Sequence, residues 1–179
     1  SDDVLEAQPD IVSHINGGPT SIPHGDIRAL CRHATGALEA VHNGNEKSAI
    51  VALEGAMDND RLADFLIGTE APAGSGVQPN GMLRMATLLA SFGGLPAELA
   101  WCCGTGNVAN RRGLRQGILA PGRPADLVFM DRPGGSPGDD VLGAMAMGNI
   151  PGIAAVMIDG KMRTGRSRST PPSARVPVI

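Results

Sequence analysis

Two side chains in this sequence have the chemistry of metal ligands, and each stands at the end of an apolar run. His14 lies in the run 10–15 just before a glycine loop, and Glu70 follows the run 65–67 and precedes a loop rich in proline and glycine. In parallel α/β folds the carboxyl ends of the strands meet at one edge, where sites are built. Imidazole nitrogen and carboxylate oxygen both bind zinc. The pair therefore predicts a metal site in which Glu70 also accepts a proton from the attacking water.

Each of these side chains also has a purely structural explanation. A histidine at a strand end can be a hydrogen-bonded structural residue, and a carboxylate after a buried strand can be half of a salt bridge. The glycines that follow His14 favour a site, because they let the backbone approach a ligand closely. We therefore expect Asn16, Gly17 and Gly18 to contact a substrate. His42, at the end of the next strand, either lines the same rim or caps the following helix, and we favour the first.

Strands alternate with helices through the first two thirds of the chain. Hydrophobic periodicity predicts strands over 10–15, 37–42 and 63–68, and helices over 23–34, 46–57, 81–91 and 96–103. Asn45 is a good N-cap for the second of these helices, and Thr105 for a short helix through Asn110. After Gly117 the pattern changes to strands over 126–130, 153–159 and 161–164, with a short helix over 139–148. Three βα units followed by a β-rich module predict a parallel sheet, open or closed.

Composition excludes several classes of function. Among the 179 residues only 2% are aromatic, and the net charge is −3, so we expect no nucleic-acid partner. The sequence contains no apolar run of about 18 residues, so we expect no membrane span. The cysteines Cys31, Cys102 and Cys103 follow neither a disulfide nor a zinc spacing. We expect buried free thiols and a reducing, cytoplasmic location.

Several motifs, taken in order, resemble the C-terminal part of the amidohydrolase superfamily. They are SHINGGPT at 13–20, GTEAP at 68–72, TGN at 105–107 and GILAPGRPADLV at 117–128. The last of them resembles that family's return from its barrel into a small β-sandwich. Within the superfamily, the segments 14–20, 140–160 and 167–172 resemble the enamidases most, which hydrolyse cyclic enamides in nicotinate breakdown.

The resemblance implies an α/β fold: the C-terminal part of a (β/α)8 TIM barrel, about its last three βα units, plus part of a small β-sandwich. The expected boundaries are 1–117 for the barrel part, 118–166 for the β-sandwich segment and 167–179 for an irregular tail. Because a closed barrel needs about 250 residues, the rest of it would lie upstream of this segment.

The resemblance also implies a metal-dependent hydrolase that cleaves a C–N bond of a small cyclic amide- or enamide-like substrate. His14 corresponds to the metal-binding histidine of the sixth strand. Glu70 corresponds to the eighth-strand acid, which binds metal and handles the proton of the attacking water. The implied cofactor is a divalent metal, with zinc ahead of iron, and the implied whole protein is a homo-oligomer.

Two departures from the family pattern leave a second interpretation open. The family has Asp where this chain has Glu70, and the extra methylene adds about 1.5 Å of reach, whereas metal–ligand distances are held to about 0.2 Å. The family's other ligands are a His-x-His pair, a fourth-strand Lys or Glu and a fifth-strand His, and this chain contains no His-x-His. The alternative is a catalytically incompetent fragment, or a non-catalytic scaffold of the same fold.

Overall fold

A computed structural model describes residues 1–71 and 77–178 of the chain. Pro72 and the central part of the loop 71–80, which the sequence marks as functional, lie outside the described residues. Within the described ranges the strands form two sheets of three strands each, one parallel and one antiparallel. The mixed α/β content expected from the sequence is confirmed.

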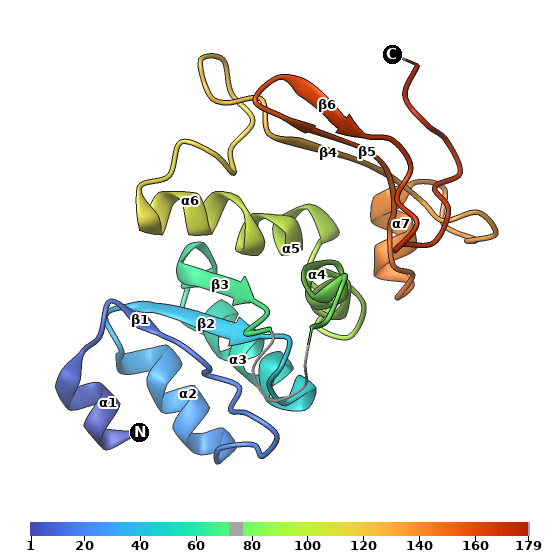
Figure 1. The fold of residues 1–179 in the computed structure, drawn as a ribbon. Helices are drawn as coiled ribbons and strands as arrows, with labels where there is room; N and C mark the ends of the chain where they lie inside the picture. The colour runs from blue at the N-terminus through green and yellow to red at the C-terminus, as the bar shows by residue number, and fades with distance from the viewer. Residues whose placement is uncertain (72–76, 179) are drawn as a thin grey trace.

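The parallel sheet carries the carboxyl ends that matter for the site. Its strands β1 (Ile11–Val12), β2 (Ala37–Val41) and β3 (Phe65–Gly68) pair in chain order. Helices α2 (His24–His33) and α3 (Glu46–Asp58) connect them and lie along the same face of the sheet (Figure 1). Parallel strands joined in this way are successive βα units. The chain after each strand therefore emerges at one edge of the sheet.

Local sequence signals explain the two crossover helices. Ile27, Leu30 and Cys31 recur at helical spacing on α2, and all three are buried. Helix α3 begins where the side chain of Asn45 accepts a hydrogen bond from the backbone N–H of Ser48 at 2.9 Å, which confirms the predicted N-cap. The apolar faces of both helices pack on the sheet and form one core with it.

Three further helices follow the parallel sheet, and a fourth lies between strands of the second sheet. These are α4 (Gly81–Ser91), α5 (Ala97–Gly104), α6 (Gly106–Arg112) and α7 (Val141–Ala146). The indole N–H of Trp101 on α5 points at the sulfur of Met145 on α7, 3.1 Å away. Met145 is fully buried in the same core as the parallel sheet, so α7 joins the two parts of the chain.

The antiparallel sheet lies beyond α5 and α6, away from the parallel one (Figure 1). Its strands β4 (Leu127–Asp131), β5 (Gly152–Ile158) and β6 (Lys161–Thr164) are ordered β4-β5-β6. The C-terminal segment is tied to it, because the carboxylate of Asp131 accepts hydrogen bonds from the guanidinium of Arg175 at 2.8 and 2.9 Å.

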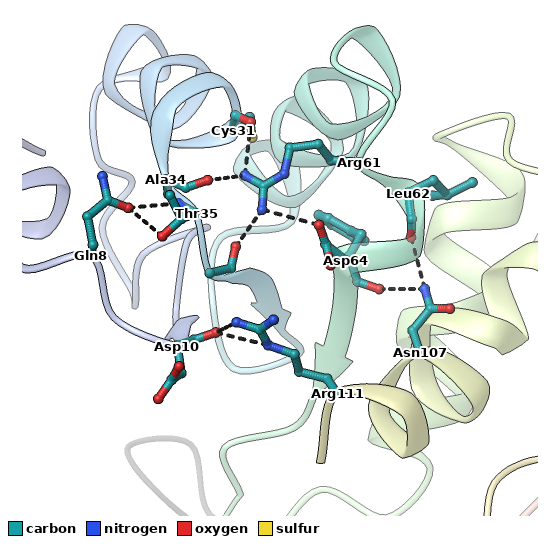
Figure 2. Close-up of polar contacts among 12 residues, drawn as sticks. Gln8, Asp10, Cys31, Ala34, Thr35, Arg61, Leu62, Asp64, Asn107 and Arg111 are labelled. Atoms are coloured by element: carbon teal, nitrogen blue, oxygen red, sulfur yellow. Dashed lines mark hydrogen bonds and ion pairs between the residues drawn. The ribbon is translucent and has the colours of Figure 1, made fainter. Parts of the chain in front are cut away.

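Side chains at the amino ends of the parallel strands form a dense polar network (Figure 2). The guanidinium of Arg61 donates to the carbonyl oxygens of Cys31, Ala34 and Gly36 and lies 3.5 Å from a carboxylate oxygen of Asp64. It therefore satisfies carbonyl groups at the end of α2, which a helix leaves unpaired, and fixes the start of β2.

Helix α6 contributes to the same network (Figure 2). Arg111 donates to the carbonyl oxygen of Asp10, just before β1. Asn107 donates to the carbonyl oxygens of Leu62 and Phe65, at the start of β3. The amino ends of all three strands are thus anchored by side chains, which leaves the carboxyl ends for the site.

Several expectations from the sequence are wrong in detail. Strand β1 has two residues, where six were expected, because the chain leaves the ladder at Ser13. Thr105 does not cap α6 with its side chain, which donates instead to the carbonyl oxygen of Trp101. Cys102 is exposed, so burial holds only for the other two thiols. A helix over Asp2–Ala7, α1, was not expected.

Candidate metal centre

His14 and Glu70 come together at the carboxyl edge of the parallel sheet. His14 follows β1 by two residues and Glu70 follows β3 by two residues. Nε2 of His14 lies 3.5 Å from a carboxylate oxygen of Glu70. Their side chains are 38% and 42% exposed, so the pair is open to solvent on one side and available to a ligand.

Both residues have a backbone conformation that is uncommon for side chains with a Cβ. The φ angle is 55° at His14 and 52° at Glu70, in the left-handed region. Such a residue costs about 1–2 kcal/mol relative to a right-handed one, and strained residues cluster at functional sites. The left-handed turn is also what takes each side chain out of the strand's alternation.

The ring of His14 is oriented by the loop that follows it. Its Nδ1 lies 3.4 Å from the carbonyl oxygen of Gly17. A proton on Nδ1 leaves Nε2 as the lone-pair nitrogen that faces Glu70. Histidine ligands of metals commonly use their other ring nitrogen in this way. Nε2 of His14 and the Glu70 carboxylate oxygen could then both face one bound cation.

Asn16 has a structural role that the sequence did not reveal. Its side chain is fully buried; it donates to the carbonyl oxygens of Val41 and Asn45 and accepts from the backbone N–H of Val41. The amide therefore bonds to the backbone at the end of β2 and holds the loop after β1 against that strand. A long-range bond of this kind leaves no local signal in the sequence. Its predicted contact with substrate stays a prediction.

Gly17 and Gly18 differ in whether a side chain could replace the glycine hydrogen. Gly17 has φ 70°, and a Cβ there would lie 2.6 Å from the carbonyl oxygen of Thr20, so only glycine fits the turn. A Cβ at Gly18 would meet no atom within 4 Å. Gly18 therefore borders open space beside the loop, which suits its predicted substrate contact.

His42 lies at the end of β2 but lines a cavity that contains neither His14 nor Glu70. Burial, and then the charge of Arg84, lower the pKa of His42, so its ring is neutral at pH 7. The backbone N–H of His42 nonetheless donates to the carbonyl oxygen of Gly68, two residues before Glu70. Its contact with substrate stays a prediction.

Nε2 of His14 and the carboxylate of Glu70 suit one metal ion as ligands, but two ligands do not complete its coordination. In a tetrahedral zinc site with bonds near 2.0–2.2 Å, neighbouring ligand atoms are about 3.3–3.6 Å apart, a range that includes the 3.5 Å between Nε2 of His14 and the Glu70 oxygen. Residues 1–71 and 77–178 contain no group of three or more His, Cys, Asp or Glu side chains that could hold a metal. Further ligands would have to come from outside the described residues.

Comparison with known proteins gives a consistent result. No family model matches the chain. It is 42% identical to enamidase of Eubacterium barkeri over all 179 residues, which correspond to 46% of that protein. The crystal structure of enamidase, described as a new member of the amidohydrolase superfamily, superposes with a TM-score of 0.94 over 98% of this chain and 46% of its own.

A more distant structure shares the fold. The β-aspartyl dipeptidase of Fervidobacterium islandicum AW-1 matches with a TM-score of 0.54 at 17% identity, over 85% of this chain and 38% of its own. The chain thus spans about half the length, or less, of the proteins it matches. The resemblance predicted from the motifs is confirmed: along its whole length, this chain is similar to enamidase, a member of the amidohydrolase superfamily.

Proposed function

We propose that this chain is the C-terminal part of a metal-dependent amidohydrolase. The whole protein would hydrolyse a C–N bond of a cyclic amide- or enamide-like small molecule. The identity of 42% with enamidase supports this reaction class. In this proposal β1, β2 and β3 are the last three strands of a (β/α)8 barrel, and β4, β5 and β6 are part of the small β-sandwich.

One observation carries the proposal: the 3.5 Å contact between His14 and Glu70. The two residues are 56 positions apart in sequence, yet equivalent left-handed turns after two parallel strands bring them together. A purely structural ion pair needs neither the strained turns nor the glycine loop at Gly17 and Gly18. Both features suit a ligand site at strand ends, where strained residues cluster and glycines let a substrate approach.

His14 and Glu70 would hold a divalent metal, zinc ahead of iron, together with ligands from the rest of the protein. When bound, that ion supplies Lewis acidity, which lowers the pKa of water and polarises a carbonyl group. Glu70 also receives a proton from the attacking water and returns it to the leaving nitrogen. Its side chain is 42% exposed, which leaves it open to solvent for this transfer.

Glu70 stands where the family has Asp, and its side chain is longer by one methylene. The φ of 52° turns the residue away from the strand direction, and the carboxylate still lies within 3.5 Å of Nε2 of His14. Nε2 of His14 and the Glu70 carboxylate thus stay close together despite the added methylene. This geometry supports a working site over the alternative of an incompetent fragment or a non-catalytic scaffold.

The remaining features of the proposal follow the family. The barrel part is taken as 1–117, the β-sandwich segment as 118–166 and the tail as 167–179. The whole protein is proposed to be a cytoplasmic homo-oligomer that binds its substrate beside Asn16, Gly17, Gly18 and His42. Among the described residues, no helix is long and apolar enough to cross a membrane.

Turnover by the whole protein tests the proposal. Glu70→Gln keeps the size of the side chain and removes its charge, so hydrolysis of cyclic amides and enamides should fall at least about 100-fold. Glu54→Gln, at an exposed carboxylate on α3 that pairs with Arg28, is the matched control and should keep full activity. A wild-type protein that hydrolyses none of these substrates, and binds no metal, would favour the scaffold.

A further inference from the structure

Glu39 lies at the centre of β2 and is the only charged residue within the strands β1, β2 and β3. Its neighbours Leu38 and Ala40 are buried in the core that the sheet shares with α2 and α3. Side chains alternate along a strand, so Glu39 points to the opposite face of the sheet. In the proposed barrel that face is the interior, where a carboxylate without hydrogen-bond partners would be costly.

Glu39 accepts hydrogen bonds from both residues that flank His14. Its carboxylate accepts from the hydroxyl of Ser13 at 2.6 Å, and its backbone carbonyl accepts from the N–H of Ile15 at 3.0 Å. Both bonds tie the turn after β1 to the middle strand of the sheet. His14, with its left-handed φ of 55°, is therefore held from both sides by one residue.

The carboxylate of Glu39 also lies against the end of β3. A Cβ on Gly68, the last residue of that strand, would lie 2.9 Å from Oε1 of Glu39, so a side chain there would push the carboxylate aside. Gly68 does not have a positive φ, so its backbone conformation does not require glycine. Gly68 precedes Glu70 by two residues. Glu39 thus lies beside both of the strand ends that present the candidate ligands.

We propose that Glu39 is a positioning residue of the candidate metal centre, an inference that rests on the proposed function. It holds the turn at His14 and lies against β3 just ahead of Glu70, so that the two ligand side chains converge. A carboxylate accepts a shorter and stronger hydrogen bond from a hydroxyl than a neutral group does, in keeping with the 2.6 Å to Ser13. Glu39 is not itself a ligand, since the described residues contain no group of three or more His, Cys, Asp or Glu side chains that could hold a metal.

The zinc affinity of the whole protein tests this role, measured on metal-free protein by titration in competition with a fluorescent chelator. Glu39→Ala should weaken zinc binding about tenfold, as the loss of a group that orients metal ligands does. Glu39→Gln should weaken it by no more than about threefold, because an amide oxygen still accepts from Ser13. Ser13→Ala should also weaken zinc binding. The double variant should be no weaker than Glu39→Ala alone, since both changes remove the same hydrogen bond.

Gly68→Ala tests the contact with β3. In wild type the added methyl displaces the carboxylate and should weaken zinc binding. In the Glu39→Ala protein the nearest remaining atom is Cγ1 of Val41 at 3.7 Å, an ordinary contact, so the same change should have little effect. The matched controls are Gly25→Ala on α2, where a Cβ meets no atom within 4 Å, and Glu54→Ala at an exposed carboxylate on α3. Both should bind zinc as wild type does.

Thermal melting of the same variants separates positioning from a purely structural role. If Glu39→Ala lowers the Tm but binds zinc as wild type does, Glu39 only stabilises the fold and the proposal is overturned. An equal loss of affinity in Glu39→Gln and Glu39→Ala would mean that the charge acts rather than the hydrogen bond, which also contradicts it. A wild-type protein that binds no zinc would refute the metal centre itself, and this inference with it.

Discussion

At the residue scale, the candidate centre depends on how two backbone turns place two side chains. His14 and Glu70 both adopt a left-handed conformation two residues beyond a strand end. Neither of these two positions is a glycine, so contacts with neighbouring residues must stabilise each left-handed turn. Asn16 contributes most on the His14 side, since its buried amide ties the loop to Val41 and Asn45.

Asn16→Ala should destabilise the protein by about 3 kcal/mol, because it leaves buried backbone groups of Val41 and Asn45 without partners. Urea denaturation measures the change. Asn110→Ala, at an exposed position on α6, is the matched control and should change stability by less than about 0.5 kcal/mol. Equal stability of the two variants would show that the amide of Asn16 does not hold the loop.

The three thiols should differ sharply in reactivity. Burial raises the pKa of Cys31 to about 11 and that of Cys103 to about 12, whereas Cys102 is exposed. Since the thiolate is the reactive form, iodoacetamide at pH 8 should label Cys102 in the folded protein and the other two only after unfolding. Peptide mass mapping reads the sites. Rapid native labelling of Cys31 or Cys103 would contradict the packing described for α2 and α5.

At the element scale, the parallel sheet has a stabilising end and a functional end. Side chains of Arg61, Asn107 and Arg111 anchor the amino ends of the strands (Figure 2). The candidate ligands emerge at the opposite, carboxyl ends. This separation means that stability and metal binding can be changed independently.

Arg61→Met tests that separation. The side chain of Arg61 is 13% exposed and donates to three carbonyl oxygens, so its loss should destabilise by about 3 kcal/mol. Metal content should not change. Arg28→Met, which breaks an exposed ion pair with Glu54, should cost less than about 1 kcal/mol. The idea fails if Arg61→Met removes metal, or if both variants are equally stable.

The antiparallel sheet holds the C-terminal segment through a pH-sensitive contact. The side chain of Asp131 is 7% exposed, and hydrogen bonds from Arg175, with those from neighbouring backbone N–H groups, lower its pKa to about 2. A depressed carboxyl pKa stabilises the folded state above the unfolded pKa, about 3.9. That stability is lost as the pH falls from about 4 to about 2.

Asp131→Asn should therefore lower the melting temperature at pH 7, and the gap from wild type should close as the pH approaches 2. Melting curves across this range measure it, and the difference between the two proteins removes the effect of the other carboxylates. Asp126→Asn, at an exposed carboxylate before β4, serves as the control with a smaller effect. A gap that stays constant with pH would mean that Arg175 does not hold Asp131 ionised.

At the scale of the whole molecule, the sequence predicted the helices of the βα units well, but it did not predict the short strand β1 or the helix α1. Helices α2, α3 and α4 begin and end within about a residue of expectation, because their apolar spacing and the Asn45 cap are local signals. Strand β1 is shorter than expected because the turn at His14 depends on contacts with β2. Helix α1 was missed because it is only six residues long and buries none of them fully, so its apolar pattern is short.

The candidate site was foreseeable in part. The residue types and strand-end positions of His14 and Glu70 were visible in the sequence, since apolar runs before glycine loops mark strand ends. The buried role of Asn16 and the separate cavity beside His42 depend on side chains that meet only in the folded chain. The described residues contain no group of three or more His, Cys, Asp or Glu side chains that could hold a metal, and the chain spans 46% of the length of enamidase.

Metal content of the whole protein tests the central claim most directly. We expect bound divalent metal in wild type, measured by plasma mass spectrometry, with His14→Ala and Glu70→Gln each lowering metal affinity by at least about tenfold. His33→Ala, at an exposed histidine on α2, should bind as wild type does. If His14→Ala and Glu70→Gln retain wild-type metal content and affinity, the two side chains form only an ion pair and the proposed centre is wrong.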